Sequence, residues 1–244
     1  MMYGSTDDKK RIADSIAILD YVYSEMPSTK GCLENIGKSK KEGGCGGWCC
    51  QVQNPSVLYV EFLNVWKNTI SKWSDKKIGE LIEACLKNYL FDRPVKGCVF
   101  FDHESKMCSQ HETRPYNCRI YGIIPEEEFK PRYERLKVLN NQTQKQCHLV
   151  STEDGSEVTM KDTDYWWNQI KGAEGAIGIK KNLINDDATG SYRTYHDHII
   201  IHVFGLDFLE QLTEIRLGSS DKEKRKIIKE MMDSYKNFMK AVGD

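Results

Sequence analysis

Residues 43–50 read Gly-Gly-Cys-Gly-Gly-Trp-Cys-Cys, so that three thiols (Cys45, Cys49 and Cys50) fall within six residues and glycines flank the first of them. Glycine lets the backbone approach a bound group closely and point its N–H groups at an anion. We therefore expect this stretch to hold a thiophilic metal, around which the irregular centre of the fold is organised.

The composition is that of an ordinary globular protein, with 39% hydrophobic and 29% charged residues in 244. The first eleven residues lack an apolar signal core, and the apolar runs are too short to cross a bilayer, so we expect a cytoplasmic protein. The formal net charge of −1 argues against nucleic-acid or anionic membrane partners. Thiols stay reduced in the cytoplasm, and the nine cysteines therefore indicate metal binding rather than a disulfide framework.

Apolar residues recur at helical spacing along most of the chain. The expected fold class is mainly α, a helical domain around an irregular cysteine-rich metal-binding centre with little β structure. Pro27 ends the first helix, Asn54 and Pro55 start the second, and Ser74 caps the third. The helices are expected over residues 7–26, from 54 onward, 74–90, 126–140, 161–171, 195–217 and 221–242.

The centre of the chain lacks this periodicity. Residues 28–53 are expected to form a loop, residues 97–101 a short strand, and residues 147–159 a small hairpin that turns at 153–156. We expect residues 1–150 to form a cysteine-cluster domain with flanking helices, and residues 151–244 a helical C-terminal region packed on it as one unit.

Cys85 differs from the other cysteines because it shares a helix face with Leu81 and Ile82, which predicts a buried core residue. The other eight fall in predicted loops, turns or element ends, where packing does not explain them. We expect these eight to be metal ligands: Cys32, Cys45, Cys49, Cys50, Cys98, Cys108, Cys118 and Cys147.

The identity of the metal is left open by the spacing. Structural zinc favours paired knuckles, and only Cys45-x3-Cys49 fits one, whereas the dispersed remainder is typical of an iron–sulfur cluster. In an extended backbone, Cys49 and Cys50 would point in opposite directions, so that both serve one metal only in a tight turn. Eight thiols allow two four-cysteine sites or one site with additional thiols.

These cysteines also carry a resemblance to a known family. Cys45-x3-Cys49-Cys50, Cys98-Val-Phe-Phe-Asp, Cys108, Arg114-Pro-Tyr-Asn-Cys-Arg-Ile-Tyr121 and Cys147 resemble the YkgJ-type, or CxxCxxCC, cysteine-cluster family, which is described as zinc- or iron-chelating. Flagellin lysine methylases carry a similar cysteine core, and this similarity implies an iron–sulfur cluster, for which we expect the 4Fe–4S type. The resemblance covers roughly residues 30–150.

The chain departs from the usual Cys-x2-Cys-x2-Cys-Cys pattern of this family. A single cysteine precedes the vicinal pair, and Cys32 lies thirteen residues upstream of Cys45, so that Cys32 either substitutes for the missing thiol or stays free. Arg114 and Arg119 flank the Cys118 segment. We expect these two residues to bind the cofactor by offsetting the negative charge of its thiolates, although ordinary surface ion pairing is the alternative.

The histidines are weaker ligand candidates. His198 and His202 align on one face if residues 195–217 are helical, but no glutamate follows the first as in a zinc protease, and hydrogen-bonded histidines on a partly buried helix are the simpler interpretation. His103, His111 and His148 lie near cysteines in the sequence, yet enough thiols are present without them.

Two functions from different classes fit these residues. The first is an iron–sulfur protein that acts in electron transfer or in a cluster-dependent modification of a small-molecule or protein substrate. The second is a zinc-stabilised interaction module without catalysis, in which the metal contributes folding free energy. The sequence does not decide whether the protein is an enzyme.

Overall fold

The computed structural model describes residues 6–35, 47–52, 54–91, 97–131, 134, 147, 149–178 and 192–243, and within them helices dominate, which confirms the predicted fold class. The helices are α1 (Thr6–Glu25), α2 (Cys32–Asn35), α3 (Trp48–Val52), α4 (Tyr59–Lys72), α5 (Asp75–Leu90), α6 (Tyr116–Arg119), α8 (Met160–Ala176), α9 (Tyr195–Phe204), α10 (Leu206–Gly218) and α11 (Asp221–Gly243). Residues 126–131 are also helical. The strands are β1 (Thr29–Lys30), β2 (Ser56–Val57), β3 (Phe101–Asp102), β4 (Met107–Cys108), β5 (Ser151–Thr152) and β6 (Arg193–Thr194).

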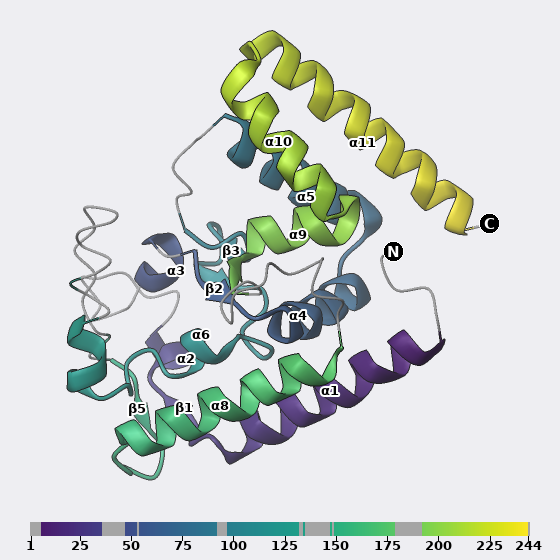
Figure 1. The fold of residues 1–244 in the computed structure, drawn as a ribbon. Coiled ribbons are helices and arrows are strands. Elements are labelled where there is room, and N and C mark those ends of the chain that lie inside the picture. Colours follow the sequence, from purple (N-terminus) through teal and green to yellow (C-terminus); the bar gives the residue numbers. More distant parts are fainter. Residues whose placement is uncertain are drawn as a thin grey trace.

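The long helices form two packed groups (Figure 1). In the lower group, α1 lies along α8 and contacts α4; in the upper group, α5 packs against α9, α10 and α11. The short helices α2, α3 and α6 and the strands β2 and β3 lie toward one side, between these groups, whereas β1 and β5 lie beside the end of α8 in the lower group. Helices α4 and α9 also contact each other, and α4 contacts α8, so that the upper and lower groups share a buried core.

Three of the predicted helices are confirmed nearly to the residue. Helix α1 ends just before the Met26–Pro27 step, and its buried face includes Ile16, Leu19 and Tyr23. Ser74 caps α5 by accepting a hydrogen bond from the Lys77 N–H. Helix α11 matches the predicted amphipathic segment.

The predicted start of the second helix at Asn54 and Pro55 is wrong. Ser56 and Val57 pair as strand β2 with Thr194 and Arg193 of β6, so the helix begins only at Tyr59. Glu61 of the new first turn accepts a hydrogen bond from the Leu58 N–H at 2.9 Å, which satisfies one of the free donors at the helix start. The Asn54 side chain bonds His196 instead of capping the helix.

The prediction of a local hairpin at residues 147–159 is also wrong. Strand β5 pairs antiparallel with β1, with Thr152 opposite Thr29, and Gly155 with a positive φ of 76° turns the chain beyond it. The strand predicted at residues 97–101 exists only at its end, where β3 forms a small hairpin with β4.

Two further expectations need correction. The predicted helix over residues 195–217 is broken at Gly205, whose φ of 96° ends α9 and starts α10. The predicted loop at residues 28–53 contains short helices, and the part at residues 36–46 lies outside the described residues. No helix in the described ranges is long and apolar enough to cross a membrane.

Candidate metal centre

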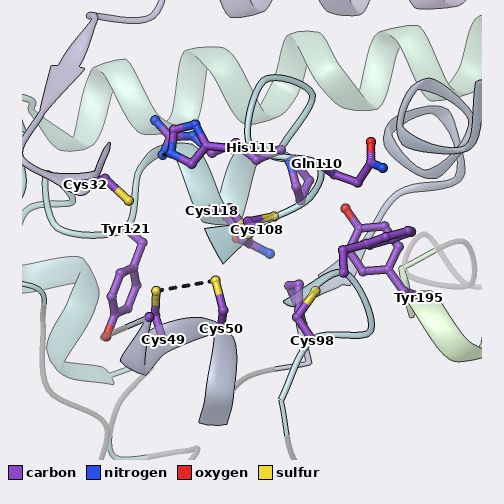
Figure 2. Close-up of a pocket in the computed structure, with 16 residues that line it drawn as sticks. Cys32, Cys49, Cys50, Cys98, Cys108, Gln110, His111, Cys118, Tyr121 and Tyr195 are labelled. Carbon is purple, nitrogen blue, oxygen red and sulfur yellow. Dashed lines mark hydrogen bonds between the residues drawn. The ribbon is translucent and has the colours of Figure 1, made fainter. Parts of the chain in front are cut away.

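Six of the eight predicted ligands line one cavity of about 60 Å³ (Figure 2). This volume is several times the roughly 10–15 Å³ that one water molecule needs. The cysteines come from five segments, α2, α3, the segment before β3, strand β4 and α6, which together span residues 32–118. They are Cys32, Cys49, Cys50, Cys98, Cys108 and Cys118.

The vicinal pair lies in the single-turn helix α3. Gly47 precedes the helix with a φ of 69°, and its carbonyl accepts a hydrogen bond from the Gln51 N–H at 3.0 Å. The Sγ atoms of Cys49 and Cys50 are 3.9 Å apart, as the dashed line in Figure 2 shows. Because the backbone is helical rather than extended, both neighbouring side chains line the same cavity.

Gly97 allows the second cysteine segment to approach the first. The Cys98 N–H donates to the Cys50 carbonyl at 2.7 Å. A Cβ atom on Gly97 would lie 2.3 Å from that carbonyl oxygen, and the φ of this glycine is 85°. Only glycine fits such a contact without backbone movement.

Helix α6 carries Cys118, and the buried carboxyl group of Glu61 fixes the start of this helix. Glu61 is 1% exposed and accepts hydrogen bonds from the Tyr116 N–H at 2.6 Å and the Tyr23 hydroxyl at 2.7 Å. Burial raises the pKa of Glu61, and these hydrogen bonds oppose that rise. The sequence analysis missed Glu61; the only signal was an acidic residue in an otherwise apolar stretch.

The cavity thiols influence one another strongly. Burial, reinforced by the neighbouring Cys108, raises the pKa of Cys98 to about 12. Burial also raises the pKa of Cys118 well above its usual range. The contact between Cys50 and Cys108 raises the pKa of Cys50 and lowers that of Cys108, because one proton is shared by the two. Metal binding by these thiols would therefore release protons and depend on pH.

The two arginines occupy different places. Arg114 lines the cavity, where its Nη1 lies 2.9 Å from His111 Nε2 and its Nη2 donates to Thr29 Oγ1. Burial raises the pKa of Cys32, and the charge of Arg114 opposes this rise. Arg114 is thus placed to offset thiolate charge.

Arg119 binds the backbone of residues 112–114, the segment that precedes helix α6. Its Nε donates to the Arg114 carbonyl at 2.8 Å and its Nη2 to the Glu112 carbonyl at 2.9 Å. The guanidinium group also stacks 4.1 Å from the centre of the Tyr23 ring. Arg119 is not among the described residues that line the cavity.

Among the predicted ligands that the structure describes, Cys147 alone is not part of this lining. Cys147 lies beside it, since a Cβ atom on Gly122 would be 3.2 Å from the Cys147 Cβ, and its charge acts on Cys32. Cys45 lies outside the described residues, as does His148. All cysteines in the described ranges are free thiols.

The remaining predictions about cysteine and histidine are resolved by burial and hydrogen bonds. Cys85 is fully buried in the apolar core, as predicted. His103 is exposed and packs on Phe101, whereas His111 lines the cavity, and burial together with Arg114 lowers its pKa to about 4.

The histidines of α9 are hydrogen-bonded, in agreement with the simpler interpretation. His196 lies between Asn54 and Asn88, at 2.9 and 3.3 Å. His198 bonds the Val57 carbonyl, and His202 bonds the Tyr59 hydroxyl at 2.8 Å. Burial lowers the pKa of His196 to about 4, so that this histidine is neutral near pH 7.

The chemistry of the donor set fits a thiophilic metal. Six thiols exceed the four that one structural zinc ion or one cluster takes from a protein. In the described part of the chain, however, no three Cys, His, Asp or Glu side chains are arranged as the ligands of a single ion. The thiols are instead distributed around the cavity wall.

The sequence analysis missed the polar and aromatic residues that complete the wall. Gln110 and Tyr195 are 2% exposed each, and Tyr121 lies near Cys49 in Figure 2. Tyr195 begins the histidine-containing stretch and showed no signal beyond helical periodicity. It is the single lining residue from the described part of the chain beyond Thr159.

Comparison with known proteins gives one match. Residues 41–148 match the CxxCxxCC family, described as "Putative zinc- or iron-chelating domain". This range includes five of the six cavity cysteines and excludes Cys32. No curated protein and no solved structure matches the chain. The resemblance of the cysteine-rich segment to the CxxCxxCC family is thus confirmed over residues 41–148.

Proposed function

We propose that the cavity holds an iron–sulfur cluster of the 4Fe–4S type, and that the protein acts in electron transfer or in a cluster-dependent modification of a small-molecule or protein substrate. The observation that carries this proposal is the convergence of six thiols from five chain segments on one cavity. When bound, such a cluster supplies one-electron chemistry.

The distribution of the thiols favours a cluster over a single ion. All ligands of a tetrahedral zinc surround one atom, with Zn–S distances of about 2.3 Å. The cysteines of a cluster bind different irons and therefore lie farther apart. The described residues contain no compact set of three ligands but do contain six thiols around a common space.

Different residues of the chain would have different roles at the metal centre. Cys98 and Cys118 would bind the centre, and Arg114 would offset its negative charge. Because six thiols line the cavity, a four-thiolate centre leaves two that are not needed as ligands.

A zinc-stabilised module is the second candidate, and one distance favours it. Tetrahedral geometry at a Zn–S distance of about 2.3 Å places two sulfur ligands roughly 3.8 Å apart. The Sγ atoms of Cys49 and Cys50 are 3.9 Å apart. In this candidate the vicinal pair forms one edge of a zinc site and the helical surface binds a protein partner.

Anaerobic purification distinguishes the two candidates. We expect a brown protein whose visible absorption bleaches in air, with iron and acid-labile sulfide in equal amounts. A colourless protein with stoichiometric zinc would overturn the proposal and leave the zinc-stabilised module.

A further inference from the structure

Tyr195 and Gln110 present buried polar groups to the cysteine cavity. Each is 2% exposed and each lines the cavity. The buried Nε2 of Gln110 has no hydrogen-bond partner among the described residues. The hydroxyl group of Tyr195 points toward the cavity in Figure 2. Figure 2 shows both residues on the side of the cavity where Cys98 lies.

Contacts on the far side fix both side chains. The Oε1 of Gln110 accepts a hydrogen bond from Asn68 Nδ2 at 2.6 Å, which orients the carboxamide and leaves its NH₂ group as the unused end. The Tyr195 ring packs edge-on against Phe100, with ring centres 4.9 Å apart. Tyr195 is also the first residue of α9, which Thr194 caps through Asp197.

Buried donors without an acceptor are rare because they lose their hydrogen bonds to water. Here Gln110 Nε2 is such a donor, and the cavity that Gln110 and Tyr195 line also contains six thiols. A metal–thiolate centre carries negative charge and offers sulfur atoms as acceptors. The only described cationic side chain on the wall, Arg114, already bonds Thr29 and His111.

We propose that Tyr195 and Gln110 donate hydrogen bonds to sulfur atoms of the metal centre and thereby set its reduction potential. This inference rests on the proposed function. A hydrogen bond to sulfur stabilises the more negative, reduced form of a cluster, so the two donors raise the potential. Both act as tuning residues rather than as metal ligands.

The test compares Tyr195→Phe, which removes one oxygen atom, with Tyr89→Phe. The Tyr89 hydroxyl bonds Thr213 between α5 and α10 and does not line the cavity. We expect Tyr195→Phe to keep its full iron content but to favour the oxidised form about tenfold more, a shift of about 59 mV for a one-electron couple. Tyr89→Phe keeps the wild-type potential.

Gln110→Glu provides a second test because it keeps the oxygen that binds Asn68 and replaces the donor group by an acceptor. We expect a larger decrease in potential, since a negative charge is added. In the wild type, hyperfine spectroscopy of the reduced cluster detects exchangeable protons near sulfur, and one is lost in Tyr195→Phe. Unchanged potentials in both variants, or no exchangeable proton in the wild type, would overturn the inference.

Metal and sulfide counts separate failure of this inference from failure of the proposed function. If the protein contains zinc instead of iron, the cluster proposal fails, and the inference is tested by zinc affinity against a competing chelator. Tyr195→Phe is then expected to weaken zinc binding about tenfold. An unchanged affinity, or a wild-type protein without bound metal, would overturn it.

Discussion

Thiols lie in two regions of the molecule, the part-buried cysteine cavity and the core between α5 and α9. Cys85 lies in the second region, where it is 0% exposed among apolar residues that repeat at helical spacing. Cys98 and Cys118 lie in the first region, near other thiols, on segments without such periodicity. Burial alone therefore does not indicate a ligand, and the ligand prediction rests instead on the convergence of thiols from irregular segments.

The two regions also differ in what holds them together. The long helices bury apolar faces against one another and need no ligand. The cavity is built from single-turn helices and two-residue strands, and helices this short are not stable in isolation. We therefore expect the metal to contribute much of the stability around the cavity and little in the α5–α9 core.

The largest expected effect comes from exchanging single thiols in the two regions. Cys118→Ser and Cys49→Ser should each lose most of the bound metal and of the soluble protein, because a ligand is removed. Cys85→Ser should keep full metal content although its side chain is buried. Metal analysis of the three purified variants checks this, and retained metal in the first two would show that the ligand assignment is wrong.

Two glycines, one at the cavity and one in a long helix, allow the same comparison for the backbone. Gly97→Ala should destabilise the fold by about 3 kcal/mol or more, because strain at positive φ adds to a clash with the Cys50 carbonyl. Gly172→Ala, in α8 with no atom within 4 Å, should stabilise by up to about 1 kcal/mol. Urea unfolding measures both; equal effects at the two sites would refute the close approach at Gly97.

Acidification should destabilise the helical core because His196 becomes protonated. Its pKa is about 4 in the fold against 6.5 as a free side chain, so the unfolded chain binds the proton more readily. The contribution of His196 to the free energy of unfolding is fully present above pH 6.5. It is lost as the pH falls to about 4, which lowers the free energy of unfolding by on the order of 3 kcal/mol. The difference in unfolding free energy between wild type and His196→Gln, followed over this range, isolates the effect; parallel curves would contradict it.

A smaller loss of stability is expected from a change at Glu61, which links the long helices to the cavity. Glu61→Gln replaces one acceptor oxygen by a donor that faces a backbone N–H or the Tyr23 hydroxyl, and should cost about 1–3 kcal/mol. Glu80→Gln, which alters an exposed ion pair with Lys76, should be nearly neutral. Similar unfolding midpoints for the two variants would argue against the buried hydrogen-bond network.

The long helices could be predicted from the sequence because their signals are local. The periodicity of α1, α5 and α11 and the cap at Ser74 lie within each element. The start of α4 could not be predicted, because strand β2 forms only by pairing with residues near position 194. The same reason applies to β5, whose partner β1 lies more than a hundred residues earlier.

The sequence predicted which residues gather at the candidate site better than it predicted how they are arranged. Six of the eight expected ligands share a cavity, while their role as metal ligands stays a prediction. Helix α3, which turns Cys49 and Cys50 toward the same space, is too short to show periodicity. Gln110 and Tyr195 could not be found because the unpartnered Nε2 of Gln110 and the place of both residues on the cavity wall are revealed only by three-dimensional contacts. The division into regions 1–150 and 151–244 also stays a prediction.

The central claim is that the cavity thiolates, and not other side chains, hold a metal. X-ray absorption at the metal edge of the anaerobically purified protein tests it most directly, because the spectrum identifies the atoms bound to the metal. We predict a first shell of sulfur only, at about 2.3 Å. A shell of nitrogen and oxygen would contradict the account and direct attention to the histidines of α9.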